Sequence, residues 1–441
     1  MIMLRRLASQ SSILFGSRII GAGIVFLAQV GIARTWGAHA LGNYMIIMAV
    51  MNIIMVFLPL GFQTIGTYFA AEYRAHKDGN MLRKFLWQAY SHVVIMGALV
   101  SVAFALYYNG SDGAGHLIKP FLLPIMIMAI SIAAMYVSNA ILVGLKRPFA
   151  GFFVDALFRP ILVISAFVLS ASLFSGDAAL LFMIEILAIG FCLLSALQFL
   201  FVVKTLKTIE CEKPKRKSES KRWWRFALPW VLIALATDFF FDIDLIILAG
   251  FLEHDELAVF GVISRIFILI SFGIVAIYAI TVPDIFESEV NNDREGFLQK
   301  VGDANLVASG LSLVLVIGAA IFGSLALKIF GEEFVIGAQP LVLLCLALLV
   351  RSIFGPASLV LSIYDKPYAS LPSVALGLFS LVGLNYAFVP KMGVLGAAIA
   401  ALLAITIWSI SQWLVALKVA KVDISIYPTL KKYAKHLFNM K

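Results

Sequence analysis

The chain has 441 residues, of which 62% are apolar and 13% are charged, and its mean hydropathy is +0.98. Soluble globular domains are about half apolar and about a quarter charged, so this composition excludes a soluble enzyme and predicts an integral membrane protein. The formal net charge of +9 is compatible with nucleic-acid binding or with a topology signal, and the positions of the basic residues distinguish the two.

Residue types that would hold a cofactor or a metal are scattered. Cys192, Cys211 and Cys345 lie far apart and indicate plain thiols rather than disulfides or metal ligands. The six histidines form no pair at helical spacing, and no glycine-rich loop ends in Gly-Lys-Ser or Gly-Lys-Thr. We therefore expect no cofactor, no metal site and no enzymatic activity.

Twelve apolar runs in the sequence are long enough to cross a bilayer, for which a helix needs about 20 apolar residues. The first follows Arg5 and Arg6 and lacks a small-residue cleavage site, which indicates a retained helix rather than a signal peptide. The predicted fold class is therefore an all-α integral membrane protein with about 12 transmembrane helices. The runs cover roughly residues 12–33, 43–66, 85–108, 117–143, 149–173, 178–203, 227–250, 257–282, 303–328, 338–363, 369–389 and 393–417.

The basic residues fix the expected orientation of these spans. With the N-terminus inside, the outward connections contain only four basic residues, whereas the inward ones contain about twenty-six. Both termini are therefore expected in the cytoplasm, and the basic charge is a topology signal that requires no nucleic-acid partner. The four outward residues are Arg34, Lys119, Lys328 and Lys391.

One long polar stretch divides the twelve spans into six and six. Residues 204–225 contain nine Lys or Arg and three Glu, and include Trp223 and Trp224 at the mouth of the next span. We expect a cytoplasmic linker held near anionic lipid headgroups. The predicted domains are an N-terminal six-helix lobe at 1–203, a basic linker at 204–226, a C-terminal six-helix lobe at 227–417 and a basic tail at 418–441.

Three short matches at intervals of 216 to 219 residues support a repeat of the two lobes. Each lobe has an even number of spans, so the lobes share one orientation and are related by a pseudo-two-fold axis along the membrane normal. Transporters of this plan hold substrate between their lobes and rock them. The matches are Ala40–Tyr44 with Glu256–Phe260, Pro124 with Pro340, and Lys146-Arg147-Pro148 with Asp365-Lys366-Pro367.

Charged side chains also occur inside the predicted spans, where each costs roughly 2.5–3.5 kcal/mol unless it is paired or faces water. At about 1.5 Å per residue, Arg159, Arg265 and Arg351 fall near mid-bilayer, as do Asp238 and Asp242. The other charged residues within spans lie shallower or nearer the span ends and are Arg18, Asp155, Glu185 and Asp244.

Arginines at this depth predict a cavity between the lobes that binds an anion, because the planar guanidinium pairs bidentately with phosphate. On this hypothesis Arg265, Arg351, Arg159 and Arg18 bind substrate. The alternative is structural ion pairing, which we favour for Asp155 because it stands four residues before Arg159 on one helix face. Arg265 and Arg351 have no acid one turn away in their own helices, so both interpretations stay open for them.

The intramembrane acids have two interpretations. Asp238, Asp242, Asp244 and Glu185 are candidates for proton or sodium coupling, because buried carboxylates are usual coupling groups in transporters. The alternative, which we favour, is that they are counter-ions to the arginines. Spacing at i and i+4 places Asp238 and Asp242 on one helix face. Both roles are compatible in an ion-coupled transporter.

Several stretches resemble polysaccharide exporters. Residues Ala33–Tyr44 resemble the short outward turn between the first two helices of that family. Asp242-Ile243-Asp244, continuing through Gly250 and Phe260 to Arg265, resembles its Asp-containing seventh helix. Leu142–Arg147 and Ile329–Phe334 also match. The chain thereby resembles Wzx-type flippases of O-antigen and exopolysaccharide units, within the multidrug/oligosaccharidyl-lipid/polysaccharide (MOP) exporter superfamily.

The resemblance implies a MATE-like fold and a flippase that moves undecaprenyl-diphosphate-linked oligosaccharide units across the bacterial inner membrane by alternating access. Because Arg34, Asp244 and Arg265 stand at positions that match the family's motifs, the resemblance implies that they are functional residues. The implied partners are the lipid-linked oligosaccharide, membrane lipids, a coupling proton or sodium ion, and the polysaccharide polymerase and chain-length proteins.

Two other functions stay open. A MATE-like cation-coupled drug or small-molecule antiporter would favour acidic and aromatic residues in its cavity, whereas this chain places arginines at mid-bilayer. A membrane-embedded polysaccharide polymerase or ligase would need a sizeable outward loop, whereas the outward connections here are about ten residues or fewer.

Overall fold

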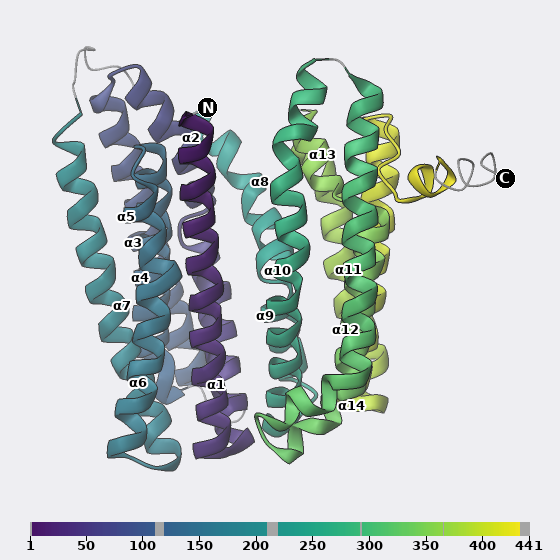
Figure 1. Cartoon of the computed structure of the whole chain (residues 1–441). Helices are drawn as coiled ribbons and strands as arrows, with labels where there is room; N and C mark the ends of the chain where they lie inside the picture. Colours follow the sequence, from purple (N-terminus) through teal and green to yellow (C-terminus); the bar gives the residue numbers. More distant parts are fainter. Residues whose placement is uncertain (1, 111–118, 210–218, 292, 365, 433–441) are drawn as a thin grey trace. The chain divides into compact units, whose positions relative to one another are not determined.

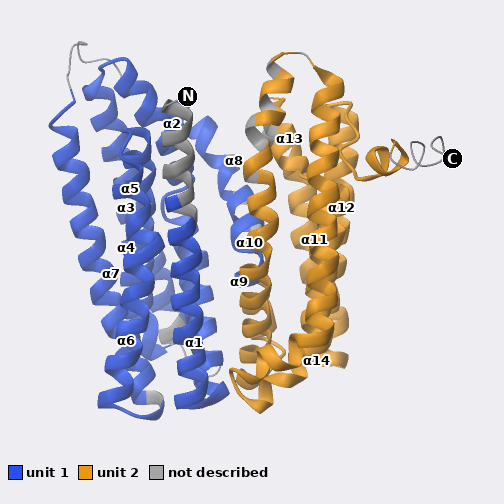
Figure 2. Cartoon of the chain, viewed as in Figure 1, with its two compact units in different colours: residues 1–242 blue, residues 243–441 orange. Residues whose placement is uncertain are grey.

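The computed structural model describes residues 2–110, 119–209, 219–291, 293–364 and 366–432, and within these ranges it contains helices and no β-strand. The predicted all-α membrane fold is confirmed. The chain forms two compact units, Met1–Asp242 and Ile243–Lys441 (Figure 2). Unit 1 extends beyond the basic linker because α8 (Ser220–Asp238) packs against α1 (Ile2–Phe57) and α2 (Phe62–Ala75). Residues 210–218 of the expected linker lie outside the described ranges.

Unit 1 is organised around α4 (Leu122–Gly144), which packs against α1, α2, α3 and α7. This helix contains no charged residue and is largely buried, as expected for a segment surrounded by other helices. The short helix α9 (Phe240–Leu248) spans the boundary between the units. The remaining elements of unit 1 are α3 (Gly79–Gly110), η1 (Lys119–Phe121), α5 (Pro148–Phe153), the π-turn η2 (Val154–Phe158), α6 (Arg159–Leu173) and α7 (Gly176–Leu206) (Figure 1).

Unit 2 is organised in the same way around α12 (Ala338–Phe354), which packs against α10 (His254–Val290), α11 (Arg294–Lys328) and α14 (Leu371–Val419). Its other elements are η3 (Glu332–Gly337), α13 (Ala357–Ile363) and η4 (Pro367–Ser370). The start of the expected C-terminal tail joins the core of this unit, because Val422 and Ile424 are buried against α10, α11 and α13.

Nine helical stretches among the described residues are long and apolar enough to cross a membrane. Two of them, of 42 and 52 residues, each contain two helices that meet at a glycine with positive φ, Gly37 in α1 and Gly393 in α14. Counting their halves separately gives eleven spans, and the interrupted segment formed by α8 and α9 corresponds to the twelfth.

The second predicted span, 43–66, differs from the structure. Its helix ends at Phe57, and α2 begins only after a turn in which Leu60 and Gly61 both have positive φ. Pro59 favours the break because it has no backbone N–H to donate. Gly61 is required there because a Cβ atom at this position would lie 2.0 Å from the carbonyl oxygen of Ala227 in α8. Hydropathy does not register such a turn, since the flanking residues are equally apolar.

The predicted repeat is visible in the local geometry of the two units. Pro124 is the third residue of α4 and Pro340 the third residue of α12, and each helix follows a 3-10 turn. Arg147, before Pro148, has φ −119° and ψ 57°, and Lys366, before Pro367, has φ −124° and ψ 44°. Proline is tolerated in a first helical turn, and in both halves it lies in the first turn of a helical element at corresponding positions.

A polar cluster fastens the start of α8 to the end of α2. The Arg222 guanidinium donates to both carboxylate oxygens of Glu72, at 2.8 and 2.9 Å, and to Glu219 at 3.0 Å. The Trp223 indole donates to the Tyr73 hydroxyl at 2.7 Å, and that hydroxyl donates to Glu219 at 3.2 Å. Burial, reinforced by the charge of Glu219, raises the pKa of Tyr73 well above its usual value, so the phenol remains a donor.

Trp223 gives a test of this attachment, because its side chain is 0% exposed and its ring centroid lies 5.2 Å from that of Phe85. We expect Trp223→Ala to lower the free energy of unfolding by about 3–5 kcal/mol, measured by unfolding the purified chain in detergent. Trp87→Ala is the matched control, because Trp87 is 77% exposed, and its effect should stay within about 0.5 kcal/mol. Equal losses in the two variants would contradict the assignment of Trp223 to the unit 1 core.

Candidate functional site

Arg159 stands at a local change in helix type in unit 1. The π-turn η2 precedes it, so its backbone N–H donates to the carbonyl of Val154, five residues earlier. The predicted pair with Asp155 is present, with Nη1 3.2 Å from Oδ1 and both side chains largely buried. The guanidinium also lies over the Phe191 ring, 5.5 Å from its centroid, and Tyr136 is within electrostatic reach. Arg159 therefore has a structural partner and an aromatic platform.

Arg18 belongs to the same region of unit 1, because α1 packs against η2. Its guanidinium lies 5.1 Å from the centroid of the Phe152 ring, and its side chain is exposed. The approach of α1 depends on Gly21, where a Cβ atom would lie 2.0 Å from the carbonyl oxygen of Ala156. Pro160, four residues after Ala156, has no N–H to donate to that carbonyl. The π-turn and the small residue together place Arg18 and Arg159 on neighbouring elements.

Asp238 and Asp242 do not share a helix face as their spacing predicts. Asp238 is the last residue of α8 and Asp242 lies in the first turn of α9, with Phe239 in a non-helical conformation between them. Asp238 is exposed, whereas Asp242 is buried and accepts a hydrogen bond from the Asn52 side chain at 3.2 Å. Interrupted helices with polar residues at the break are typical of substrate and ion sites in transporters.

Asp244 is the most enclosed acid of the candidate set, with 0% of its surface exposed. Its Oδ1 accepts a 2.6 Å hydrogen bond from Asn385 in α14, and its Oδ2 has no hydrogen-bond partner among the described residues. A buried carboxylate oxygen without a donor is costly in an apolar interior. The Oδ2 atom could accept a proton or bind a small cation, as the predicted ion-coupling role of Asp244 requires.

Arg265 and Arg351 occupy spans of unit 2, on α10 and α12 respectively. Arg265 is half-buried, and the Arg351 side chain is exposed, with its guanidinium 5.5 Å from the centroid of the Trp408 ring. This is a cation–π contact, and the planar guanidinium is a group of the kind that pairs bidentately with phosphate.

Two predicted residues lie apart from these clusters. Arg34 is exposed on α1, three residues before the break at Gly37. Glu185 is exposed on α7 and makes no ion pair within the described part of the chain.

Sequence reasoning overlooked the uncharged partners of the charged candidates. Asn52 and Asn385 are amides inside apolar spans, and that contrast with their neighbours is a signal that could have identified them. Tyr136, Phe191 and Trp408 carried no comparable signal, because aromatic residues are abundant throughout these spans.

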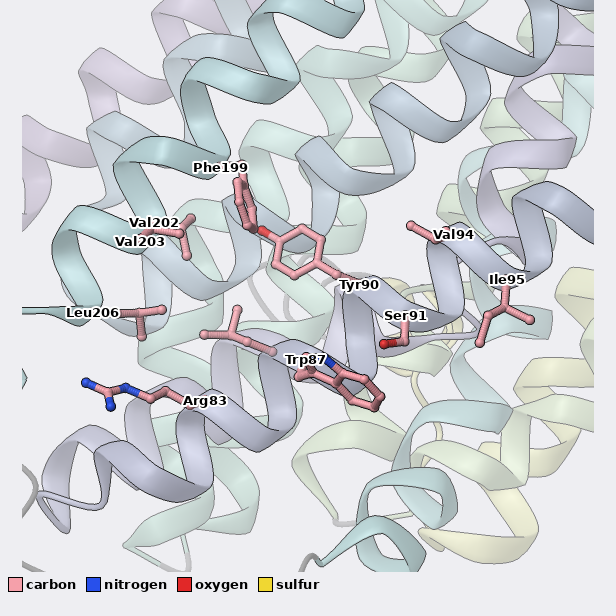
Figure 3. A pocket seen from close by; sticks show the side chains of 11 residues that line it. Arg83, Trp87, Tyr90, Ser91, Val94, Ile95, Phe199, Val202, Val203 and Leu206 are labelled. Carbon is pink, nitrogen blue, oxygen red and sulfur yellow. The ribbon is translucent and has the colours of Figure 1, made fainter.

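A groove of about 510 Å³ runs between α3 and α7 of unit 1 (Figure 3). Arg83 lies at one end, and the Tyr90 hydroxyl is hydrogen-bonded to Ser138 at 2.7 Å. The remaining lining is mainly apolar and includes Trp87, Val94 and Phe199. None of the predicted substrate or coupling residues lines this groove, so it is distinct from the candidate site.

Solved structures of known transporters share this fold. An inward-facing multidrug resistance MATE family transporter of the MOP superfamily aligns over 93% of this chain and 98% of its own, with a TM-score of 0.74 and 16% identity. The lipid II flippase MurJ, in an inward closed conformation, aligns over 93% of this chain and 88% of its own, with a TM-score of 0.73 and 16% identity.

A third MOP superfamily transporter with this fold comes from Pyrococcus furiosus, and its description reports a reversed polarity of the binding pocket. It aligns over 91% of this chain and 93% of its own, with a TM-score of 0.62 and 15% identity. At these identities the likeness establishes the fold, which is that of the MOP exporters. The predicted MATE-like architecture is thereby confirmed.

Sequence comparison gives the family. No curated protein matches the chain. The family model described as polysaccharide biosynthesis protein matches residues 7–289, which is more than half of the chain. The chain therefore belongs to the polysaccharide biosynthesis protein family, and it has the fold of the MOP exporters.

Proposed function

We propose that this protein is a flippase that moves undecaprenyl-diphosphate-linked oligosaccharide units across the bacterial inner membrane by alternating access, for O-antigen or exopolysaccharide synthesis. The family and the fold support a membrane transporter in polysaccharide biosynthesis. The observation that carries the proposal is the presence of guanidinium groups within apolar spans, positioned on aromatic rings.

The chemistry of the cargo explains why arginine is suited to this position. A diphosphate linked to a lipid carries negative charge that must cross a region of low dielectric constant. Arginine stays protonated there and offers several N–H donors in one plane, so it can replace the water that hydrates the phosphates. Arg265 and Arg351 are the strongest candidates, because both fall near the middle of their predicted spans, where a phosphate is hardest to accommodate.

The other arginines have different roles in this proposal. Arg159 is paired with Asp155, so only part of its charge is available to cargo. Arg18 and Arg34 are exposed and would contact cargo near the ends of the transport path. The polysaccharide polymerase and chain-length proteins would use the delivered units on the periplasmic side, and both termini of this chain would lie in the cytoplasm.

A second candidate, a cation-coupled antiporter, is favoured by one observation. Two buried aspartates, Asp242 and Asp244, each accept a hydrogen bond from an asparagine amide, Asn52 and Asn385 respectively. Such carboxylates are suited to binding a proton or sodium ion. In the flippase proposal the same groups couple cargo movement to an ion gradient, whereas in an antiporter they would bind the cationic substrate itself.

The arginine hypothesis predicts loss of transport in single variants. We expect Arg265→Ala and Arg351→Ala each to lower flipping of undecaprenyl-diphosphate-linked oligosaccharide at least about 30-fold, because each removes a charge-assisted contact to a desolvated phosphate. Flipping is measured in vesicles containing the purified chain, as the fraction of substrate that an added glycosidase can reach.

Arg351→Lys separates charge from geometry, since lysine keeps the charge and loses the planar guanidinium that lies over the Trp408 ring. Lys328→Ala is the matched control, because Lys328 is an exposed cation paired with Glu332 at 3.3 Å, and it should flip at the parent rate. Parental flipping in both alanine variants, at equal protein content, would exclude the arginine hypothesis.

The coupling hypothesis is tested at Asp244. Asp244→Asn keeps the size of the side chain and can retain a hydrogen bond to Asn385, but it removes the titratable group. We expect flipping by this variant to lose its acceleration by an imposed proton or sodium gradient, whereas the exposed Asp284→Asn retains it. If Asp244→Asn responds to both gradients as the parent does, Asp244 is not a coupling site.

A further inference from the structure

A basic cavity of about 420 Å³ opens at one end of unit 1, where α2, α4 and α7 all terminate. The distribution of basic residues assigns this end to the cytoplasm. Four of its lining residues are cationic, and no carboxylate is among its described lining residues. The lining residues are Arg74, Lys77, Leu145, Lys146, Arg147, Thr205, Thr208 and Ile209.

Basic residues at helix C-termini often compensate the negative end of the helix dipole. The dipole charge of the three helix ends is, however, smaller than the positive charge of the four cations. Each helix end carries about −0.5 of an elementary charge, which gives about −1.5 for three helices. The four cations contribute four positive charges and so exceed this by about 2.5. Dipole compensation therefore accounts for less than half of the positive charge around the cavity.

The backbone conformation of the two lysines is a second observation. Lys77 has φ +50° and Lys146 has φ +60°, a left-handed conformation that glycine or asparagine usually supplies at the end of a helix. Both helices end in the same hydrogen-bond pattern: Lys77 N to Arg74 O with Asp78 N to Tyr73 O, and Lys146 N to Val143 O with Arg147 N to Leu142 O.

Two helices from different parts of the sequence thus place lysine where glycine would fit best, and both lysines line one cavity. Both lysines adopt an unfavourable backbone conformation beside the same cavity, which indicates that their side chains have a role there. Lys421 also has a positive φ, of +55°, but it follows α14 in unit 2 and does not line this cavity.

Two threonine hydroxyl groups line the cavity, and their hydrogen bonds show whether they can donate to a ligand. Thr205 Oγ1 donates to the carbonyl of Phe201 and Thr208 Oγ1 donates to the carbonyl of Thr205, so neither hydroxyl proton points to a ligand. Arg147 lies over the Phe201 ring, 5.7 Å from its centroid, which fixes its guanidinium at the cavity wall. The other polar side chains that line the cavity are the four cationic ones.

We propose that this basic cavity binds a phosphoryl anion at the cytoplasmic membrane surface, supplied by the headgroup of an anionic phospholipid or by a soluble phosphate or diphosphate. Clustered lysine and arginine beside transmembrane helices recognise such groups through charge. The site shares no residue with the candidate transport arginines, so it is independent of the proposed cargo.

The test removes the two lysines without straining the backbone. Lys77→Gly and Lys146→Gly restore the residue that the left-handed conformation favours, so the melting temperature should not fall. The full chain in detergent is titrated with phosphatidylglycerol, with zwitterionic phosphatidylcholine as the reference lipid, and adducts are counted by native mass spectrometry. We expect phosphatidylglycerol binding to weaken about 5-fold for each variant and about 30-fold for both together.

Lys421→Gly is the matched control, because it makes the same substitution at the same backbone conformation outside the cavity. It should bind phosphatidylglycerol as the parent does. Inorganic diphosphate is then added to the parent: displacement of the lipid assigns a soluble ligand, and retention of the lipid assigns the headgroup. Parental lipid binding by the double variant, or an equal loss in Lys421→Gly, would overturn the proposal.

Discussion

The absence of water inside a bilayer is the constraint on which this structure depends. A backbone N–H or C=O group that lacks a partner there costs several kcal/mol, so the spans must be helical and every interruption needs a local remedy. Three of the interruptions in this chain lie beside intramembrane charges. The π-turn precedes Arg159, the break at Phe239 separates Asp238 from Asp242, and the helix bearing Arg351 ends at Phe354.

The charged residues are accommodated in two different ways. Arg159 has an acid on its own helix, and Asp242 and Asp244 have asparagine partners from distant helices. The guanidinium groups of Arg18, Arg159 and Arg351 also lie over aromatic rings. A cation–π contact contributes about 0.5–2 kcal/mol, which offsets only part of the roughly 2.5–3.5 kcal/mol cost of a charge at a helix centre. An anion would also stabilise a guanidinium in such a position, so arginine is suited to a phosphate-bearing cargo.

Much of the fold follows from sequence patterns that are local. Span positions come from runs of apolar residues, and eleven of the twelve expected spans correspond to long apolar helices or their halves. Proline marks the repeat, because Pro124 and Pro340 are the third residues of α4 and α12, and Pro148 and Pro367 each begin a short helical element. The pair of Asp155 with Arg159 follows from helical spacing alone. Each of these features involves residues that are close in the chain, and so the sequence by itself determines them.

Tertiary packing decided the features that join distant residues. The amides that serve Asp242 and Asp244 lie 190 and 141 residues away in the chain, and no periodic pattern connects them. Separation of α2 from α1 depends on the close approach of Ala227 to Gly61, and the shared face expected for Asp238 and Asp242 is lost to one non-helical residue. Apolar periodicity is the same for every helix of a membrane bundle, so it cannot specify which helices meet. The sequence determined which segments lie in the bilayer, and side-chain packing decided which polar groups meet inside it.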